Sequence, residues 1–224
     1  MIAFAYGPFT FEPGRALRVA GEAYRAWVMR YESEKLGERT APAEAAQTDI
    51  IGLFGVDRGA FESRARREHA PARIDLIDFE TGDAIGSFAS DSDCGMTPGL
   101  IDDRSRYWIR SADRRRCRDV TLSQFAGIAA AHSAPENAWT AGLMPDSVMT
   151  TEAERWRPPT SWEIRHVVGE GSFTGVSGAK AAALVGVTPQ NFRKYTARDG
   201  AASRQSMSFA LWHLLLHRLG VQRA

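Results

Sequence analysis

Residues 177–196 read SGAKAAALVGVTPQNFRKYT, and this stretch decides how the C-terminal third of the chain folds. Its first half is rich in alanine, which favours a helix, and Ser177 is a good N-cap for that helix. Gly186 ends the helix, because a sharp turn there needs a residue that tolerates positive φ. Thr188 caps a second helix, and Pro189 stands at its first position, where a missing N–H costs nothing. The stretch therefore predicts two short helices joined by a tight turn, a helix-turn-helix.

The second of these helices has an inward and an outward face. The residues spaced to pack inward are Val185, Val187, Phe192 and Tyr195, and Ala182 lies where two crossing helices meet most closely. The outward face carries amides, which can pair with adenine, and cations, which can contact guanine or phosphate. An ordinary helical hairpin with a solvated polar face is the alternative, but turn chemistry, packing and polar face agree on DNA binding. The predicted DNA-contacting residues are Thr188, Gln190, Asn191, Arg193, Lys194, Arg198 and Arg204.

Length and composition place the chain among ordinary globular proteins. It has 224 residues, 44% of them hydrophobic and 25% charged, enough for one large domain or two to three small ones. The N-terminus lacks the basic region and long apolar run of a signal peptide, and no stretch approaches the length of a membrane span. Two cysteines are too few for a disulfide framework. We therefore expect a cytoplasmic protein without a membrane partner.

Charge is divided unevenly along the chain. The formal net charge is only +1, yet from residue 155 onward ten cations face three anions, which gives this segment +7 and leaves −6 for the rest. A basic C-terminal module is thus joined to an acidic N-terminal body. This division indicates different partners for the two parts.

The N-terminal 90 residues are predicted to form an antiparallel sheet with a helix. Hydrophobic residues alternate through residues 1–32, with a third strand expected at 24–31, although a helix is not excluded there. Residues 43–69 carry a helical pattern that three glycines interrupt. Residues 73–89 are the clearest hairpin, in which Ile74 and Leu76, with Phe79 as a further candidate, pair across the turn with Ile85 and Phe88.

The remaining chain is predicted to be helical. After a loop at 90–99, short helices are expected at 122–131 and 135–142, the second turning Trp139 inward. This middle region, 91–150, is too small and alanine-rich to bury much core alone, so we expect it to pack against a second copy. Residues 151–224 should form an all-α module, with a helix starting at Thr160 or Ser161 and a last helix at about 206–219. The predicted class is α+β, with domains at 1–90, 91–150 and 151–224.

No enzyme, cofactor or metal site is predicted. Ser177 and Lys180 match an S-x-x-K pattern, but its companion motifs are absent, and the helix-turn-helix accounts for both residues. His213 and His217 lie four residues apart on one helix, without a third ligand. The arginine-rich run from Arg110 to Arg118 is equally consistent with a solvated loop and with contacts to phosphate or acidic protein. Its arginines are Arg110, Arg114, Arg115, Arg116 and Arg118.

The last third of the chain resembles a known family. The residues that carry the likeness are RPPTSWEIRHVVGEGSFTGVSGAKAAALVG at 157–186, NFRKYTARDGAASRQ at 191–205 and SFALWHLLLHRLGV at 208–221. They resemble the C-terminal domain of type I-F anti-CRISPR proteins in which an inhibitor is fused to an anti-CRISPR-associated helix-turn-helix repressor domain. A looser likeness extends upstream through Gly7-Pro8-Phe9, Asp102-Asp103-Arg104, Tyr107-Trp108, Ser133-Ala134-Pro135 and Trp139.

This resemblance implies a protein with two functions. The N-terminal part would bind the crRNA-guided type I-F surveillance (Csy) complex along its backbone subunits and block recognition of target DNA. The middle region would hold a homodimer, and the C-terminal dimer would repress its own operon from an inverted repeat in promoter double-stranded DNA. The alternative is a transcriptional regulator that responds to a ligand or partner without inhibiting CRISPR; a deep apolar pocket within residues 1–90 would favour it. An enzyme with an appended DNA-binding domain is a third possibility and would need a convergent polar cleft.

Overall fold

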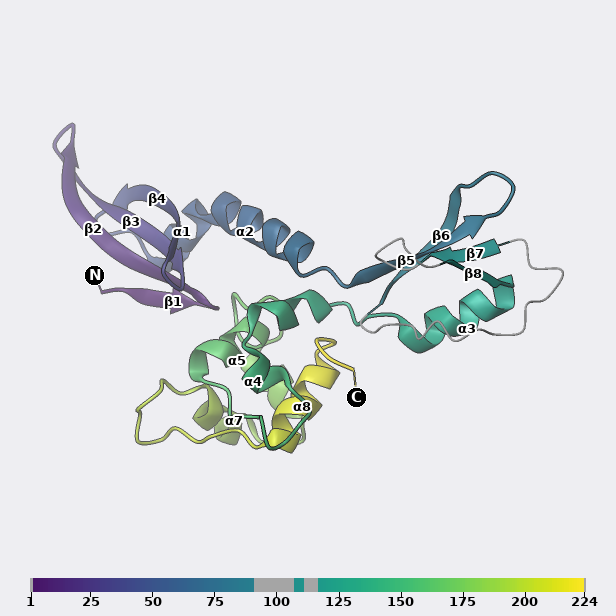
Figure 1. The fold of residues 1–224 in the computed structure, drawn as a ribbon. Helices are drawn as coiled ribbons and strands as arrows, with labels where there is room; N and C mark the ends of the chain where they lie inside the picture. Colours follow the sequence, from purple (N-terminus) through teal and green to yellow (C-terminus); the bar gives the residue numbers. More distant parts are fainter. Residues whose placement is uncertain (1, 91–106, 111–116, 224) are drawn as a thin grey trace.

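Two four-stranded antiparallel sheets and a group of helices make up the protein (Figure 1). The computed structural model describes residues 2–90, 107–110 and 117–223, apart from the side chains at 117 and 118. The mixed α+β class expected from the sequence is confirmed. Within those residues no helix is long and apolar enough to cross a membrane.

The first sheet is a meander of four strands in chain order. Its strands are β1 (Phe4–Tyr6), β2 (Phe9–Val19), β3 (Glu22–Tyr31) and β4 (Glu34–Pro42). The strand expected at 24–31 is confirmed as β3, which pairs with both β2 and β4. Aromatic side chains dominate the buried face, where Phe9, Phe11 and Trp27 are at most 2% exposed. Such residues favour a half-buried pleated surface, which explains why β3 is not helical.

Two helices cover the buried face of this sheet. They are α1 (Gln47–Leu53) and α2 (Gly55–Glu68), and the interruption predicted within 43–69 is confirmed at Phe54. The Phe54 ring is 1% exposed and lies edge-on to Phe11 of β2 at 5.5 Å. The break therefore turns an aromatic side chain into the core of the first sheet.

The second sheet differs from the expected domain plan. It contains β5 (Ala72–Asp78), β6 (Ala84–Ser90), β7 (Tyr107–Arg110) and β8 (Cys117–Val120), in the order β6-β5-β7-β8. The 73–89 hairpin is confirmed, with Ile74 opposite Phe88, but Phe79 lies outside it and is 56% exposed. The hairpin also belongs to a separate sheet, whose strands lie on both sides of the expected boundary at residue 90. The expectation of a purely helical middle region was therefore wrong.

One helix covers the second sheet. This helix, α3 (Leu122–His132), confirms the one expected at 122–131 and places Phe125 and Ile128 against the buried sheet residues. A capping box between Thr121 and Gln124 starts it. The buried core here consists of Ile74, Leu76, Phe88, Ile109 and Val120.

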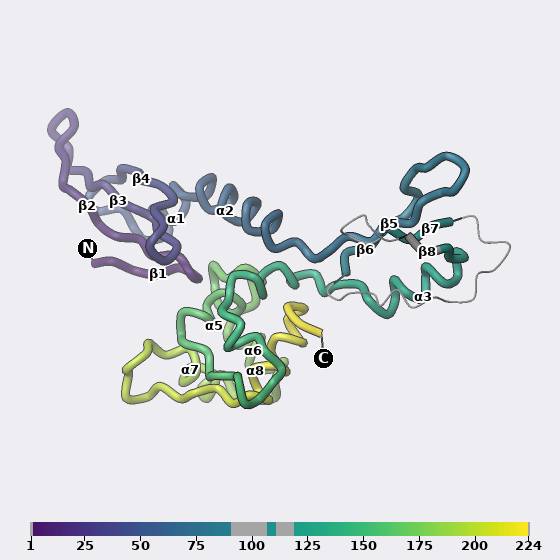
Figure 2. Tube along the Cα trace, in the orientation of Figure 1, coloured from purple at the N-terminus to yellow at the C-terminus, as the bar shows by residue number. Residues whose placement is uncertain are grey.

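After the second sheet the chain returns to the first one. The amide of Ala134 donates to the carbonyl of Ala89 at 2.8 Å, and Ala72 pairs with Ser90, so the chain leaves α3 close to the point where β5 begins (Figure 2). A 3-10 turn, η1 (Ala138–Leu143), then packs beside α2. Trp139 on this turn is 4% exposed, as expected from the sequence.

The last part of the chain forms the largest core. Its helices are α4 (Asp146–Met149), α5 (Ser161–Val167), α6 (Gly178–Leu184), α7 (Pro189–Thr196) and α8 (Phe209–Arg218). Trp212, Leu215 and Leu216 of α8 are fully buried against Ile164 and Phe192. The last helix begins three residues later than expected, because Ser208 caps it through the amide of Leu211.

Candidate nucleic-acid interface

Local hydrogen bonds fix α6, the turn after it and α7. The hydroxyl of Ser177 accepts from the amide three residues on at 3.3 Å, and Thr188 does the same for Asn191 at 3.2 Å. Gly186 adopts a φ of +71°, and the amide of Val187 reaches back to the carbonyl of Ala182 at 3.0 Å. Together with the bond from Gly186 to Ala183, this is a Schellman ending of α6. The predicted caps and turn are confirmed.

The inward residues of this unit hold α7 against the core. Ala182 is fully buried, Phe192 is 1% exposed, and Val187 and Tyr195 are partly buried against the same cluster. A larger side chain at Ala182 would separate the helices. The packing predicted from residue spacing is therefore confirmed.

The outward face of α7 is exposed and its polar side chains are free. Gln190, Asn191 and Arg193 are exposed, and Lys194 is half-buried. Within the described part of the chain, none of these four side chains has a hydrogen bond or an ion pair. Thr188 is exposed, but its hydroxyl caps α7. Helix α7 thus offers two amides and two cations to a ligand without breaking an existing contact.

The other two predicted DNA-contacting arginines lie in the loop after α7, and they differ in exposure and in their partners. Arg198 is exposed, whereas the Arg204 side chain is only 12% exposed and forms an ion pair with Asp199 at 3.2 Å. Arg204 also donates to the carbonyls of Pro159 at 2.9 Å and Gln205 at 3.2 Å. The structure therefore places Arg204 inside the loop and leaves Arg198 on its surface.

Asp199 connects this loop to the start of α5. Its carboxylate accepts from the amide of Ser161 at 3.1 Å and from the Ser161 hydroxyl at 2.8 Å. Burial would raise the pKa of Asp199, but hydrogen bonds from Ser161 and Arg204 outweigh it and hold that pKa below its usual range. Asp199 is therefore an ionised anchor that fixes the loop to α5.

A buried carboxylate organises the same helix end. Glu163 is 3% exposed and receives two bonds from Arg157, at 2.6 and 2.9 Å. It also closes a capping box with Thr160, which confirms the helix start predicted there. Burial would raise the pKa of Glu163, but the bonds from Arg157 and Thr160 outweigh it and lower that pKa. The RPPTSWE segment thus builds a rigid support for α5.

The far side of α5 contacts the first sheet. The Tyr31 hydroxyl lies 2.8 Å from Nε2 of His166, and Nδ1 of His166 lies 3.0 Å from the carbonyl of Trp162. Because a carbonyl only accepts, Nδ1 carries the proton and Nε2 accepts from Tyr31. Burial lowers the pKa of His166 to about 4, so the ring is neutral near pH 7. Sequence reasoning missed this contact, because nothing in the local pattern pairs residues 31 and 166.

Two glycines allow the sheet and the segment after α5 to approach closely. Gly7 has a φ of +60°, and a Cβ there would collide with the carbonyl of Gly171. Nearby, the Trp162 indole donates to the carbonyl of Pro8 at 3.1 Å. Phe173 inserts its ring between the first sheet and α2, 5.9 Å from Phe9. The group of helices to which α7 belongs is thus packed onto the first sheet.

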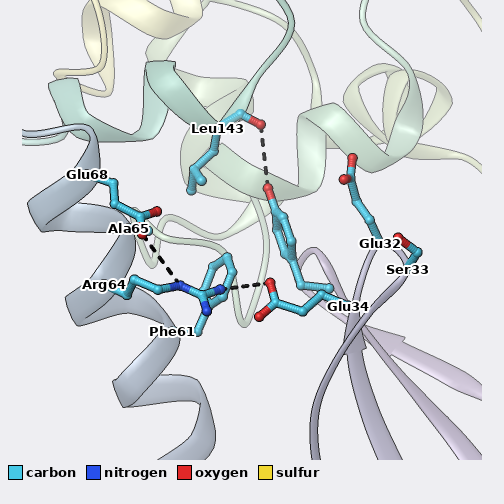
Figure 3. A pocket seen from close by; sticks show the side chains of 9 residues that line it. Glu32, Ser33, Glu34, Phe61, Arg64, Ala65, Glu68 and Leu143 are labelled. Atoms are coloured by element: carbon cyan, nitrogen blue, oxygen red, sulfur yellow. Dashed lines mark hydrogen bonds and ion pairs between the residues drawn. The ribbon is translucent and has the colours of Figure 1, made fainter.

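A small pocket lies between β3, β4, α2 and η1 (Figure 3). Its volume is about 190 Å³, and Arg64 crosses it to pair with Glu34 at 2.7 Å. Carboxylates contribute much of its lining, over a base of Tyr31 and Phe61. This pocket is small and polar, so it is not the deep apolar pocket that would favour the ligand-responsive alternative.

The other candidate sites contribute little to this interface. Ser177 acts as a helix cap, and Nδ1 of His213 bonds to Gln222 at 2.9 Å. In the described ranges no group of three metal-ligating side chains occurs. From the arginine-rich run only Arg110 is described with its side chain, and it is half-buried. Arg114, Arg115, Arg116 and the side chain of Arg118 lie outside the described residues, as do the 91–99 segment and Asp102 to Arg104.

No family model matches this chain, and no curated protein matches it either. These two comparisons therefore do not select a function for the chain.

Proposed function

We propose that the protein is an anti-CRISPR inhibitor of the type I-F surveillance complex that also represses its own operon through α6 and α7. The observation that carries the DNA-binding half is the exposed outer face of α7, with two amides and two cations that have no partner among the described residues. In this proposal α6 and α7 form a helix-turn-helix, and α7 enters the major groove. The net charge of +7 after residue 154 favours approach to the phosphate backbone.

Removing both cations from α7 tests the DNA-binding half. We expect Arg193→Ala combined with Lys194→Ala to weaken operator binding by about 1–3 kcal/mol for each good contact. Arg193 is exposed, Lys194 is half-buried, and neither side chain has a partner among the described residues, so thermal stability should stay close to that of the parent. Fluorescence anisotropy against a duplex that the full-length protein selects from a random-sequence pool measures the loss. Unchanged affinity would overturn the assignment of α7 as the recognition helix.

The inhibitor half is supported by the resemblance of the chain to type I-F anti-CRISPR proteins and by the acidic character of the N-terminal body. We propose that this body binds the backbone subunits of the Csy complex. Co-elution with the purified complex on a sizing column, with a defined stoichiometry, is the expected result. The Arg193→Ala, Lys194→Ala double variant should co-elute equally well. Failure to co-elute, together with failure to restore phage infection of immune cells, would remove the inhibitor half.

We further propose that the protein is a homodimer joined through the region around α3. This helix has no Asp, Glu, Lys or Arg, yet it lies on the surface, with Leu122 54% exposed. A helix without a charged face normally has its surface covered. A covered α3 would complete the small core of the second sheet.

A charge placed on α3 tests the homodimer. We expect Ala126→Glu to give a monomer, because an unpaired carboxylate at a buried interface is strongly unfavourable. Sedimentation equilibrium at several concentrations measures the mass. Ala60→Glu, on the exposed face of α2, is the matched control and should remain a dimer. A wild-type protein that sediments as a monomer would contradict the proposal.

A further inference from the structure

The loop between α7 and α8 is long but held in one shape at several points. The amide of Gln205 donates to the carbonyl of Lys194 at 3.0 Å, which returns the loop to the end of α7. The amide of Ala201 bonds to Arg198 at 3.0 Å, and the amide of Arg204 bonds to Ala201 at 2.9 Å. Figure 1 shows this segment extending beside α7. The loop is therefore a defined structure next to the proposed recognition helix.

Asp199 and Arg204 anchor the loop to a different helix. Asp199 receives three bonds, from the Ser161 amide, the Ser161 hydroxyl and Arg204. Arg204 adds its bond to the carbonyl of Pro159, which precedes α5. The anchor holds the backbone that bears Arg198, whose side chain is exposed and has no partner in the described part of the chain.

We propose that Arg198 is a second DNA contact that binds phosphate beside the groove read by α7, and that Asp199 and Arg204 are positioning residues for it. This inference rests on the proposed DNA binding. A cation whose backbone is already fixed loses less conformational entropy when it binds phosphate than one on a mobile loop. The planar fork of Arg204 suits the anchoring role, since it serves one carboxylate and two carbonyls together.

The opposing explanation is that Arg204 itself contacts DNA, as its sequence position had indicated. The two explanations differ in what Arg204→Lys does. Lysine keeps the charge and can bind phosphate, but it cannot reproduce the fork that joins Asp199 and Pro159. A direct contact should tolerate this change, whereas a positioning role should not.

A double-mutant cycle between Arg198→Ala and Arg204→Lys tests the proposal in the full chain, on the duplex selected from the random-sequence pool. We expect Arg198→Ala to weaken binding roughly three- to tenfold and to reduce the salt slope by about 0.9, the value for one phosphate contact. Arg204→Lys should weaken binding by a similar factor. Added to Arg198→Ala, however, it should have almost no further effect, because it acts only through Arg198.

Matched variants separate this inference from the proposed function. Arg67→Ala removes the same charge from an exposed position on α2, which Figure 1 shows well away from α7, and should leave the salt slope unchanged. Additive effects in the cycle, or normal binding by Arg198→Ala, would overturn the loop proposal even if the Arg193 and Lys194 variant loses binding. Failure of the protein to select any duplex would overturn both.

Discussion

Replacing Phe173 by alanine should lower the free energy of unfolding by about 3–5 kcal/mol, the range for deleting a buried aromatic ring. Phe173 is 8% exposed and lies 5.1 Å from Trp139, 5.7 Å from His166 and 5.9 Å from Phe9. These neighbours come from three different parts of the chain. The cavity would open where the first sheet meets the group of helices to which α7 belongs. Because α7 depends on that group for its position, operator binding should weaken together with stability.

Urea unfolding measured by tryptophan fluorescence and by circular dichroism checks this expectation. Because the first sheet and α5 share the Phe173 contacts, both signals should report one transition in the parent protein. Phe79→Ala is the matched control, since Phe79 is 56% exposed and meets the Trp108 ring edge to face. It should cost less than about 1 kcal/mol. Equal losses for the two variants would contradict the buried role of Phe173.

The parts of the fold that the sequence predicts well are those that depend on neighbouring residues. Ser177, Gly186 and Thr188 fix caps and a turn within a few residues of themselves, and the structure shows each in the expected role. The 73–89 hairpin follows for the same reason, because its turn sets the register between Ile74 and Phe88. Short-range chemistry needs no knowledge of the rest of the chain.

The pairing of short strands was not predictable in this way. Strands β7 and β8 have four residues each, too few to show a clear alternation, and they join the β5–β6 hairpin only because β7 pairs with β5. A hydrophobic run such as Tyr107-Trp108-Ile109 does not say which strand it will join. For this reason the middle region was expected to be helical.

The candidate interface shows the same division between local and distant information. The outer face of α7 follows from helical spacing, whereas the role of Arg204 depends on Asp199 reaching Ser161, 38 residues away. From the sequence, Arg204 could be predicted only as a cation near α7. Its burial, which decides what it does, comes from packing against the start of α5.

The contact between Tyr31 and His166 is also long-range and has its own consequence for stability. It joins β3 to α5 across 135 residues and uses a neutral imidazole. Protonating Nε2 would remove the acceptor that lies 2.8 Å from the Tyr31 hydroxyl, leaving the more distant Leu143 carbonyl at 3.5 Å, and would place a charge among aromatic rings. The nearest carboxylate on α5, Glu163, is already paired with Arg157, and Arg165 on the same helix opposes a further positive charge.

We therefore expect acid to destabilise the protein through His166. Its pKa is about 4 in the folded protein and 6.5 unperturbed, so the unfolded chain binds the proton first as pH falls. The stability that comes with the neutral His166 ring is fully present above pH 6.5. It is lost as pH falls from 6.5 to about 4, which lowers the free energy of unfolding by about 3 kcal/mol in all. His166→Gln can still accept from Tyr31 but does not titrate, so its unfolding free energy should vary less with pH across this window. His217→Gln, at an exposed position on α8, should keep the parent slope. Parallel curves for the parent and His166→Gln would show that the imidazole is not buried in its neutral form.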